Sequence, residues 1–163
     1  MKMKKLLFLL IFASLIATSV LSDSGVKETY TPIFMSREAL ESSVKYISGA
    51  RDMVQTGKIY YRAPYIYVNE LYKGVHIINN TNPANPVNEG FILAPGCIDM
   101  AVKGNILYLD NAVDLVSIDL DSKQITKRIR DVFPEPTPPD DVFYRGFRNR
   151  PEGYILVEWR KNF

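Results

Sequence analysis

Short hydrophobic runs rich in β-branched and aromatic residues recur along the chain from Ile47 onward. Each run is bounded by Gly, Pro, Asn or Asp, the residues that favour turns. This pattern predicts closely spaced β-strands, which we place at residues 58–61, 65–68, 75–78, 106–109, 115–118 and 154–157. Because no long helical pattern separates the runs, the sequence favours an all-β fold over a parallel α/β sheet.

One segment near the N-terminal end has helical spacing instead. Leu40 and Val44 are four residues apart, which places them on one face of a helix. Ser36 is a favoured N-cap residue, and an acidic residue such as Glu38 is favoured in the first turn. We therefore expect one short helix over residues 36–46.

The first 22 residues have the three-part pattern of a secretory signal peptide. Three lysines among the first five residues precede a run of eleven uncharged residues, 6–16, and then small residues follow. The run is too short to span a membrane comfortably, so we expect cleavage after Ser22 or Ser19, with an uncleaved N-terminal anchor as the alternative. No cysteine lies just past the run, which leaves a lipid anchor unsupported. The expected location is outside the cytoplasm: periplasmic, cell-surface or secreted.

The strand pattern is repeated along the chain. Residues 65–69 align with 106–110 at an offset of 41, and residues 75–79 align with 115–119 at an offset of 40. A β-rich repeat with a period near 40 and several strands per unit is typical of β-propeller blades. The alternative is a β-sandwich that contains two similar hairpins.

Upstream of these strands the alignment continues at a different offset. Residues 49–57 align with 96–104 at an offset of 47, with Gly, Asp, Met and Gly matched in order. This alignment pairs Asp52 with Asp99 and leaves residues 58–63 as an insertion in the first unit, expected as a loop or a lengthened hairpin.

Several of these segments resemble the LVIVD-repeat family of exported bacterial β-propeller proteins. The resemblance rests on VHIIN at 75–79, LVSID at 115–119, NPANP at 82–86 and KGNILY at 103–108, and it covers about residues 30–163. It implies a propeller-type fold and supplies no catalytic motif. The chain departs from the family in two ways. Many relatives look like lipoproteins, whereas this chain lacks the cysteine for a lipid anchor. Many relatives are also much longer, so this chain resembles only their N-terminal part.

We expect an all-β fold of β-propeller-like blades, partial, with two to three units and one short N-terminal helix. A propeller closes with about 4 to 8 blades. The chain is therefore expected to continue in a longer polypeptide or to associate through its terminal blade, with Tyr154 and Trp159 near the surface. The expected organisation is a signal peptide at 1–22, a polar segment and helix at 23–46, two β repeats at 47–132, and a Pro-rich connector with the start of a third unit at 133–163.

Polar residues at the ends of the repeated strands are expected to form turns. Asn79 and Asp119 follow a strand directly, where their side chains can accept hydrogen bonds from backbone N–H groups two residues on. We assign this structural role to four repeat turn positions: Asp52, Asn79, Asp99 and Asp119.

The segment after the connector combines aromatic residues with arginines. Residues 133–141 hold four prolines, which predicts an extended connector. The cluster that follows is a candidate surface for a carbohydrate, an anionic polymer or a partner's carboxylates, formed by Tyr144, Arg145, Phe147, Arg148 and Arg150. The alternative is that these arginines pair with Asp140, Asp141 and Glu152 over a solvated loop.

The composition excludes several kinds of functional site. One cysteine, Cys97, and one histidine, His76, exclude an internal disulfide and a Cys/His metal site by count. The formal charge of +2 becomes −1 when the three leader lysines are removed, so nothing indicates a nucleic-acid partner. A Cys–His dyad has no support from the spacing, and no phosphate loop or nucleophile elbow occurs.

We therefore expect no catalytic, metal-binding or cofactor-binding residues. The sequence favours an exported, non-catalytic β-repeat module that binds a protein or glycan, or acts as a scaffold, at the bacterial cell envelope. The alternative is a carbohydrate hydrolase that uses Asp or Glu residues, with Asp99, Asp110 and Asp119 as the candidate carboxylates around a cleft. Convergence of these carboxylates in one cleft would favour the hydrolase, whereas separate turn positions would favour the binding module.

Overall fold

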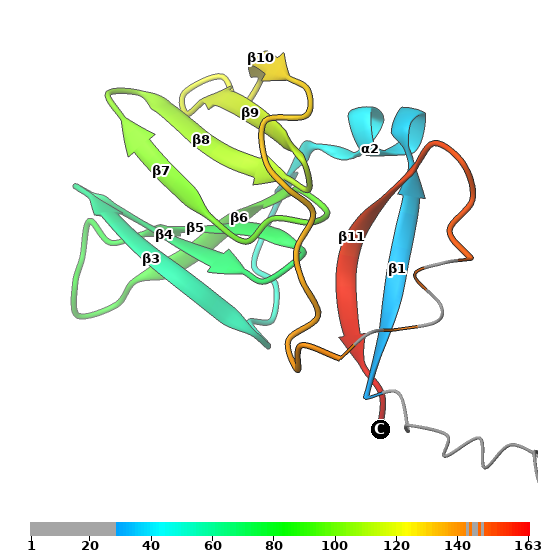
Figure 1. The fold of residues 1–163 in the computed structure, drawn as a ribbon. Helices are drawn as coiled ribbons and strands as arrows, with labels where there is room; N and C mark the ends of the chain where they lie inside the picture. The colour runs from blue at the N-terminus through cyan, green and yellow to red at the C-terminus, as the bar shows by residue number, and fades with distance from the viewer. Residues whose placement is uncertain (1–28, 143, 145–146, 148) are drawn as a thin grey trace, which may run out of the picture.

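The computed structural model describes residues 29–163 except 143, 145, 146 and 148. The described residues form three antiparallel sheets and one helix (Figure 1), which confirms the mostly-β fold. Within them no closed barrel or ring of sheets occurs. The predicted signal peptide lies outside the described residues. None of the described helical residues belongs to a segment long and apolar enough to cross a membrane.

The largest sheet has five strands in the order β2–β6–β5–β4–β3. Every neighbouring pair in it is antiparallel, as expected for strands joined by short turns. Its strands are β2 (Lys45–Ser48), β3 (Thr56–Arg62), β4 (Tyr65–Glu70), β5 (Gly74–Asn79) and β6 (Val87–Leu93).

The second sheet has four strands in the order β10–β9–β8–β7, again antiparallel throughout. It lies beside the five-stranded sheet in Figure 1. Its strands are β7 (Met100–Lys103), β8 (Ile106–Asn111), β9 (Asp114–Asp119) and β10 (Ile125–Ile129).

The third sheet joins the two ends of the described chain. β1 (Tyr30–Ser36) pairs with β11 (Tyr154–Lys161), the segment expected to begin a third unit. Trp159 on β11 is only 4% exposed, so the expectation that it lies near the surface is wrong. It is buried because its ring packs on two other aromatic side chains that flank this sheet. Tyr154 is 40% exposed.

The helix α2 (Arg37–Ser43) follows β1 directly and is shorter than expected. Ser36 caps it as predicted, because its hydroxyl accepts a hydrogen bond from the Ala39 backbone N at 3.2 Å. The last three residues of the predicted range are not helical, because Val44 is extended and Lys45 begins β2. There the backbone pairs with β6, and strand pairing replaces the helical hydrogen bonds.

The two larger sheets repeat the same hairpin in the same register. Tyr65 faces Asn79 across β4 and β5, and Ile106 faces Asp119 across β8 and β9. These are the residues that the offsets of 41 and 40 align. The change of offset falls in the turn, which has three residues between β4 and β5 and two between β8 and β9.

The register corrects the alignment upstream of β4. Arg62 faces Tyr65 across β3 and β4, and Lys103 faces Ile106 across β7 and β8, so the offset of 41 continues into these strands. The counterpart of Asp99 is therefore Lys58 and not Asp52. The extra residues lengthen β3 to seven residues against four in β7, which is the lengthened hairpin that the sequence allowed.

The main hydrophobic core lies between the two larger sheets. The five-stranded sheet contributes Tyr67, Val75, Ile77 and Ile92, and the four-stranded sheet contributes Met100, Val102, Leu107, Leu109, Val116 and Ile118. We call the face of each sheet that joins this core its inner face and the opposite face its outer face. Contacts at the sheet edges close the core, since the Tyr60 hydroxyl on β3 donates to the Val102 carbonyl on β7 at 2.9 Å.

Two smaller clusters cover the two-stranded sheet. One packs α2 and the β8–β9 turn against β11 through Leu40, Ala112, Val113, Ile155 and Val157. The other packs Leu156 and Trp159 against Tyr144. The ends of the described chain are thus held against the second of the two larger sheets.

Candidate binding surface

Two apolar hollows lie on either side of the proline-rich segment. The first, of about 390 Å³, lies on the outer face of the four-stranded sheet and is called the sheet groove. The second, of about 370 Å³, lies against β11 and is called the tryptophan pocket. Pro136 lines both. Hollows of this size and apolar character are typical of binding sites.

Side-chain and backbone contacts fix the proline-rich segment between the two hollows. The backbone N–H of Phe133 donates to the Val113 carbonyl at 3.0 Å, at the start of the segment. The Trp159 indole N–H donates to the Pro136 carbonyl at 2.9 Å. The Glu135 carboxylate accepts a hydrogen bond from the backbone N–H of Leu156 at 3.1 Å. Prolines lack the N–H groups that would join a sheet, so these contacts take the place of strand pairing.

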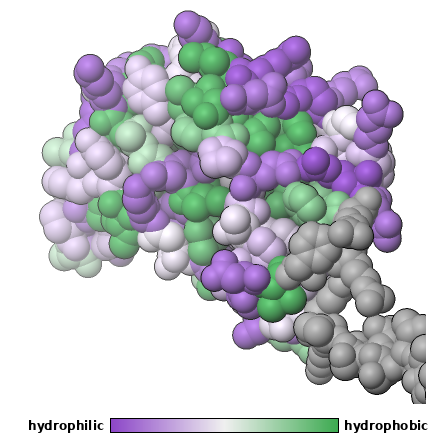
Figure 2. Space-filling view, viewed as in Figure 1, coloured by the Kyte–Doolittle hydropathy of each residue, from purple (hydrophilic) through white to green (hydrophobic). Residues whose placement is uncertain are grey.

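The floor of the sheet groove is the outer face of β7, β8 and β9. Tyr108 and Leu115 are half-buried, and Ala101 on β7 is exposed. Phe133, which is 38% exposed, forms one wall. The face of the molecule seen in Figure 2 shows hydrophobic patches between hydrophilic residues. An apolar face of this kind is suited to contact with another apolar surface.

The charged groups at the polar end of the sheet groove form ion pairs and hydrogen bonds within the protein. Lys58 and Asp99 form an ion pair of 2.7 Å. The Asp110 carboxylate accepts hydrogen bonds from the backbone N–H groups of Ile98 and Asp99, both at 2.9 Å. Burial raises the pKa of Asp110, and these N–H groups counteract the rise. The carboxylate therefore fixes the chain before β7.

The predicted aromatic and arginine cluster is only partly a surface. Tyr144 is 1% exposed, and its hydroxyl donates to Asp140 at 2.6 Å and accepts from the Tyr30 backbone N–H at 3.1 Å. It therefore belongs to the core around Trp159 and lines the tryptophan pocket, whereas the sequence predicted that it lies on an open surface. Phe147 stacks on Trp159 with ring centroids 6.1 Å apart, and lines the tryptophan pocket.

The structure describes one of the three arginines of that cluster, Arg150. Arg150 pairs with Glu135 at 2.5 Å, and not with the acidic residues that the sequence suggested. Its guanidinium also lies over the ring of Phe147, 5.3 Å from the centroid. Arg145 and Arg148 lie outside the described residues.

The four repeat turn positions differ in their contacts. Asn79 accepts from the Thr81 backbone N–H at 2.9 Å, and Asp119 accepts from Asp121 and Ser122 at 3.2 and 2.8 Å. These are the turns expected from the sequence. Asp99 accepts from the next backbone N–H at 2.6 Å and forms the ion pair described above, while Asp52 lies exposed in the segment before β3.

The three carboxylates of the hydrolase alternative lie at two ends of one hairpin. Asp110 is near the β8–β9 turn, whereas Asp119 faces Ile106 at the opposite end. Four residues of strand separate these ends, or about 13 Å. Asp99 and Asp110 do lie at the same end of the sheet groove. Both are engaged in the contacts described above.

His76 and Cys97 lie on opposite sides of the five-stranded sheet. Cys97 belongs to the main core, as do Val75 and Ile77, the two neighbours of His76 on β5. Because side chains alternate along a strand, His76 points to the outer face. Burial raises the pKa of the Cys97 thiol well above its ordinary value, which makes the thiolate scarce. The two side chains thus do not form a dyad.

His76 is enclosed by groups from three other segments. Its Nε2 lies 3.5 Å from the Glu70 carboxylate on β4 without a hydrogen bond, and its ring contacts Phe91 on β6 at 4.7 Å. Asn88 on β6 lies 3.5 Å from Nδ1, and Arg51 lies over Phe91. Burial lowers the pKa of His76, Glu70 raises it, and the net direction is downward.

The lowered pKa predicts a loss of stability in mild acid. The unfolded chain binds a proton on His76 near pH 6.5, whereas the folded chain binds it only at lower pH. The contribution of neutral His76 to the free energy of unfolding is therefore fully present above about pH 6.5 and declines as the pH falls below that value. Urea unfolding at pH 7.5 and 5.5 should show this decline. In His76→Val it should be smaller, and an equal decline in both proteins would contradict the assignment.

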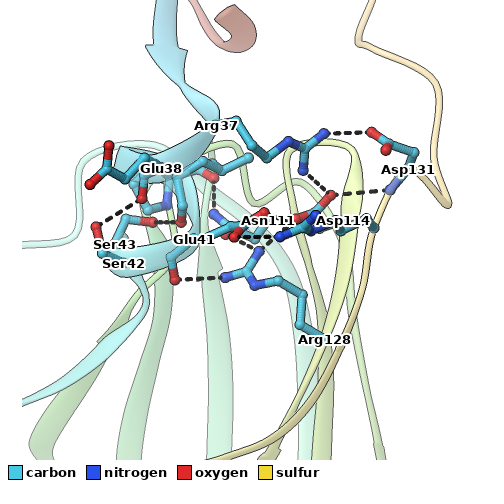
Figure 3. A network of polar contacts seen from close by, with 12 residues as sticks. Arg37, Glu38, Glu41, Ser42, Ser43, Asn111, Asp114, Arg128 and Asp131 are labelled. Carbon is cyan, nitrogen blue, oxygen red and sulfur yellow. Dashed lines mark hydrogen bonds and ion pairs between the residues drawn. The ribbon is translucent and has the colours of Figure 1, made fainter. Parts of the chain in front are cut away.

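A second polar cluster, which the sequence did not indicate, joins α2 to the four-stranded sheet (Figure 3). Asp114 has no exposed side-chain surface, and its carboxylate binds Arg37 at 2.6 Å and Arg128 at 2.7 Å. It also accepts from the Asp131 backbone N–H at 3.1 Å. Arg128 reaches Asn111 as well, at 2.8 Å. Arg37 is 77 residues from Asp114 in the chain, so no local motif marks the cluster.

No family model, no curated protein and no solved structure matches this chain. Among the residues that the structure describes, no group of three or more His, Cys, Asp or Glu side chains could hold a metal ion. The function is therefore inferred from the residues and the geometry set out above.

Proposed function

We propose that this chain is an exported, non-catalytic binding module of the bacterial cell envelope. Its two larger sheets are blades of the LVIVD type, and its sheet groove holds a protein partner. The leader pattern supports export, and the repeated register of the two hairpins supports the blade assignment.

The observation that carries this proposal is the apolar outer face of the four-stranded sheet. Ala101, Tyr108 and Leu115 offer hydrophobic and aromatic surface in a groove of about 390 Å³. A protein partner gains most from such a surface, because apolar contact is the main source of binding free energy there. A glycan would need polar groups along the floor, and the charged groups of the groove lie together at one end, with Lys58 and Asp99 already paired.

The hydrolase alternative has one observation in its favour, the shared location of Asp99 and Asp110. Glycoside hydrolysis needs one carboxylic acid and one free carboxylate on either side of the bond. The hydrogen bonds of Asp110 to two backbone N–H groups and the ion pair of Asp99 favour a structural role for both.

Cross-linking from the groove tests the proposal. In cells that produce the whole chain, a photo-reactive phenylalanine in place of Tyr108 should give an adduct that protease removes and glycan hydrolases do not. The same group in place of Tyr154, a half-exposed tyrosine on β11 outside the sheet groove, is the matched control and should give little adduct. No adduct at position 108, or an adduct made of polysaccharide, would contradict the proposal.

A further inference from the structure

The repeat aligns residues on the outer face of each larger sheet with residues on the inner face of the other, which are buried in the main core. The offsets of 41 and 40, which the strand registers preserve, align Tyr108 with Tyr67 and Leu115 with Val75. Tyr67 and Val75 are 1% and 0% exposed in the main core. The floor of the sheet groove therefore repeats the surface on which the five-stranded sheet receives the four-stranded sheet.

The converse relation holds for the outer face of the five-stranded sheet. The same offsets align Ile59, Ile66, Val68, His76 and Ile78 with Met100, Leu107, Leu109, Val116 and Ile118, all of which lie in the main core. Val68 and His76 are only 5% and 1% exposed, because the segment around Arg51 already covers this part of the face. The open part of the outer face consists of Ile59 and Tyr61, which are 69% and 62% exposed, and the half-buried Ile66 and Ile78. Four of the five aligned positions keep an aliphatic side chain on both sheets, and His76 is the exception.

Each copy of the chain thus carries the groove floor and an open part of the face that matches it. We propose that the sheet groove receives the open part of the outer face of the five-stranded sheet, at Ile59 and Tyr61, of a second copy. The intermolecular contact repeats part of the packing of the main core. This inference rests on the proposed function, since it identifies the protein partner as a copy of this chain.

The contact joins two different surfaces, which gives the assembly a direction. Such a heterologous contact leaves one free groove and one free outer face on every dimer, so further copies can add until a ring closes or a filament forms. The proline-rich segment covers one side of the groove at Phe133 and Pro134, and the contact is made beside it, over Ala101, Tyr108 and Leu115.

Two single substitutions separate the two surfaces. Ile59→Lys charges the outer face of β3, and Ala101→Lys charges the groove floor on β7, both at exposed positions where a lysine leaves the core intact. Each should weaken self-association of the full chain about tenfold or more in sedimentation, because a charge would have to be buried in the contact. Tyr154→Lys, on the two-stranded sheet, is the matched control and should leave association unchanged. Circular dichroism and urea unfolding check that each variant is folded.

Mixing the two defective variants is the decisive experiment. Ala101→Lys keeps an intact outer face and Ile59→Lys keeps an intact groove, so the mixture should form dimers that grow no further. A symmetric contact through one face predicts that one of the two variants still associates alone. A wild-type chain that stays monomeric at every concentration, or a mixture that stays monomeric, would overturn the inference. An adduct from position 108 with a different protein, together with a monomeric chain, would overturn it while leaving the proposed function in place.

Discussion

Replacing Asp114 with alanine should lower the free energy of unfolding by about 3 to 5 kcal/mol. The carboxylate is fully buried and is the shared partner of Arg37 and Arg128 (Figure 3). Its removal leaves two guanidinium groups, 28% and 14% exposed, without their main counter-charge. It also releases α2 from the β8–β9 hairpin. Urea unfolding followed by circular dichroism measures the loss.

Asp131 provides the matched control for Asp114. It pairs with the same Arg37 at 2.5 Å, but its side chain is 69% exposed. Asp131 has φ +54°, which asparagine tolerates, and exposed ion pairs contribute little, so Asp131→Asn should cost about 0.5 kcal/mol. Equal losses in the two variants would contradict the central role of the buried carboxylate.

The decline of the free energy of unfolding at acid pH is a second measurement of the contribution of Asp114. Burial by itself raises the pKa of this carboxyl, but hydrogen bonds from Arg37 and Arg128 outweigh it and hold the pKa below its ordinary value of 3.8. The unfolded chain therefore binds this proton first, and the contribution of Asp114 is present above about pH 4 and is lost as the pH falls through the folded-state pKa. The Asp114→Ala variant should lack this part of the acid transition.

Replacing Gly74 with alanine should cost about 3 kcal/mol or more. Gly74 begins β5 with φ +143°, which side chains rarely adopt, and an added Cβ would lie 1.9 Å from the Ile92 carbonyl oxygen on β6. Backbone on a central strand cannot move away without breaking the β5–β6 pairing, so strain and overlap add together.

Gly104, in the β7–β8 turn, is the control for Gly74. It also has positive φ, +60°, but nothing lies within 4 Å of an added Cβ. Gly104→Ala should therefore show the conformational cost alone, about 1 kcal/mol. Urea unfolding of both variants separates the two contributions, and a cost for Gly74→Ala no larger than that for Gly104→Ala would show that β6 yields easily.

Local pattern predicted six of the eleven described strands and the repeated hairpin, and it missed β1, β2, β6, β7 and β10. All six strand segments inferred from hydrophobic runs lie in observed strands, and the offset of 41 aligns Ile106 with Tyr65 in the same register. The turns at Asn79 and Asp119 followed from their side-chain chemistry. These features depend on residues close together in the chain.

Features set by distant contacts could not be predicted in the same way. The helix expected to reach residue 46 ends at Ser43 because β6, more than forty residues later, pairs with the chain from Lys45 onward. The pairing of β1 with β11 and the burial of Trp159 also join the two ends of the described chain. Hydrophobic pattern does not specify which strands pair across such separations.

The candidate site shows the same division. Aromatic and arginine residues drew attention to the segment at 144–150, yet Tyr144 is core and Arg150 is paired with Glu135. The sheet groove was not predicted. The alignment of Tyr67 with Tyr108 could have indicated the groove, because the two tyrosines lie on equivalent faces of the two larger sheets. The face with Tyr67 packs against the four-stranded sheet, whereas the face with Tyr108 has no further sheet against it among the described residues.

Methyl NMR of the full chain at increasing concentration tests most directly whether the two outer faces are the binding surfaces. The account predicts concentration-dependent shifts or broadening for the methyl groups of Ile59 and Leu115, which lie on those faces. The methyl groups of Leu107 and Ile118 in the main core should stay unchanged, as should those of Leu40 beneath the two-stranded sheet. Changes confined to the two-stranded sheet, or an invariant spectrum in a chain that does associate, would contradict it.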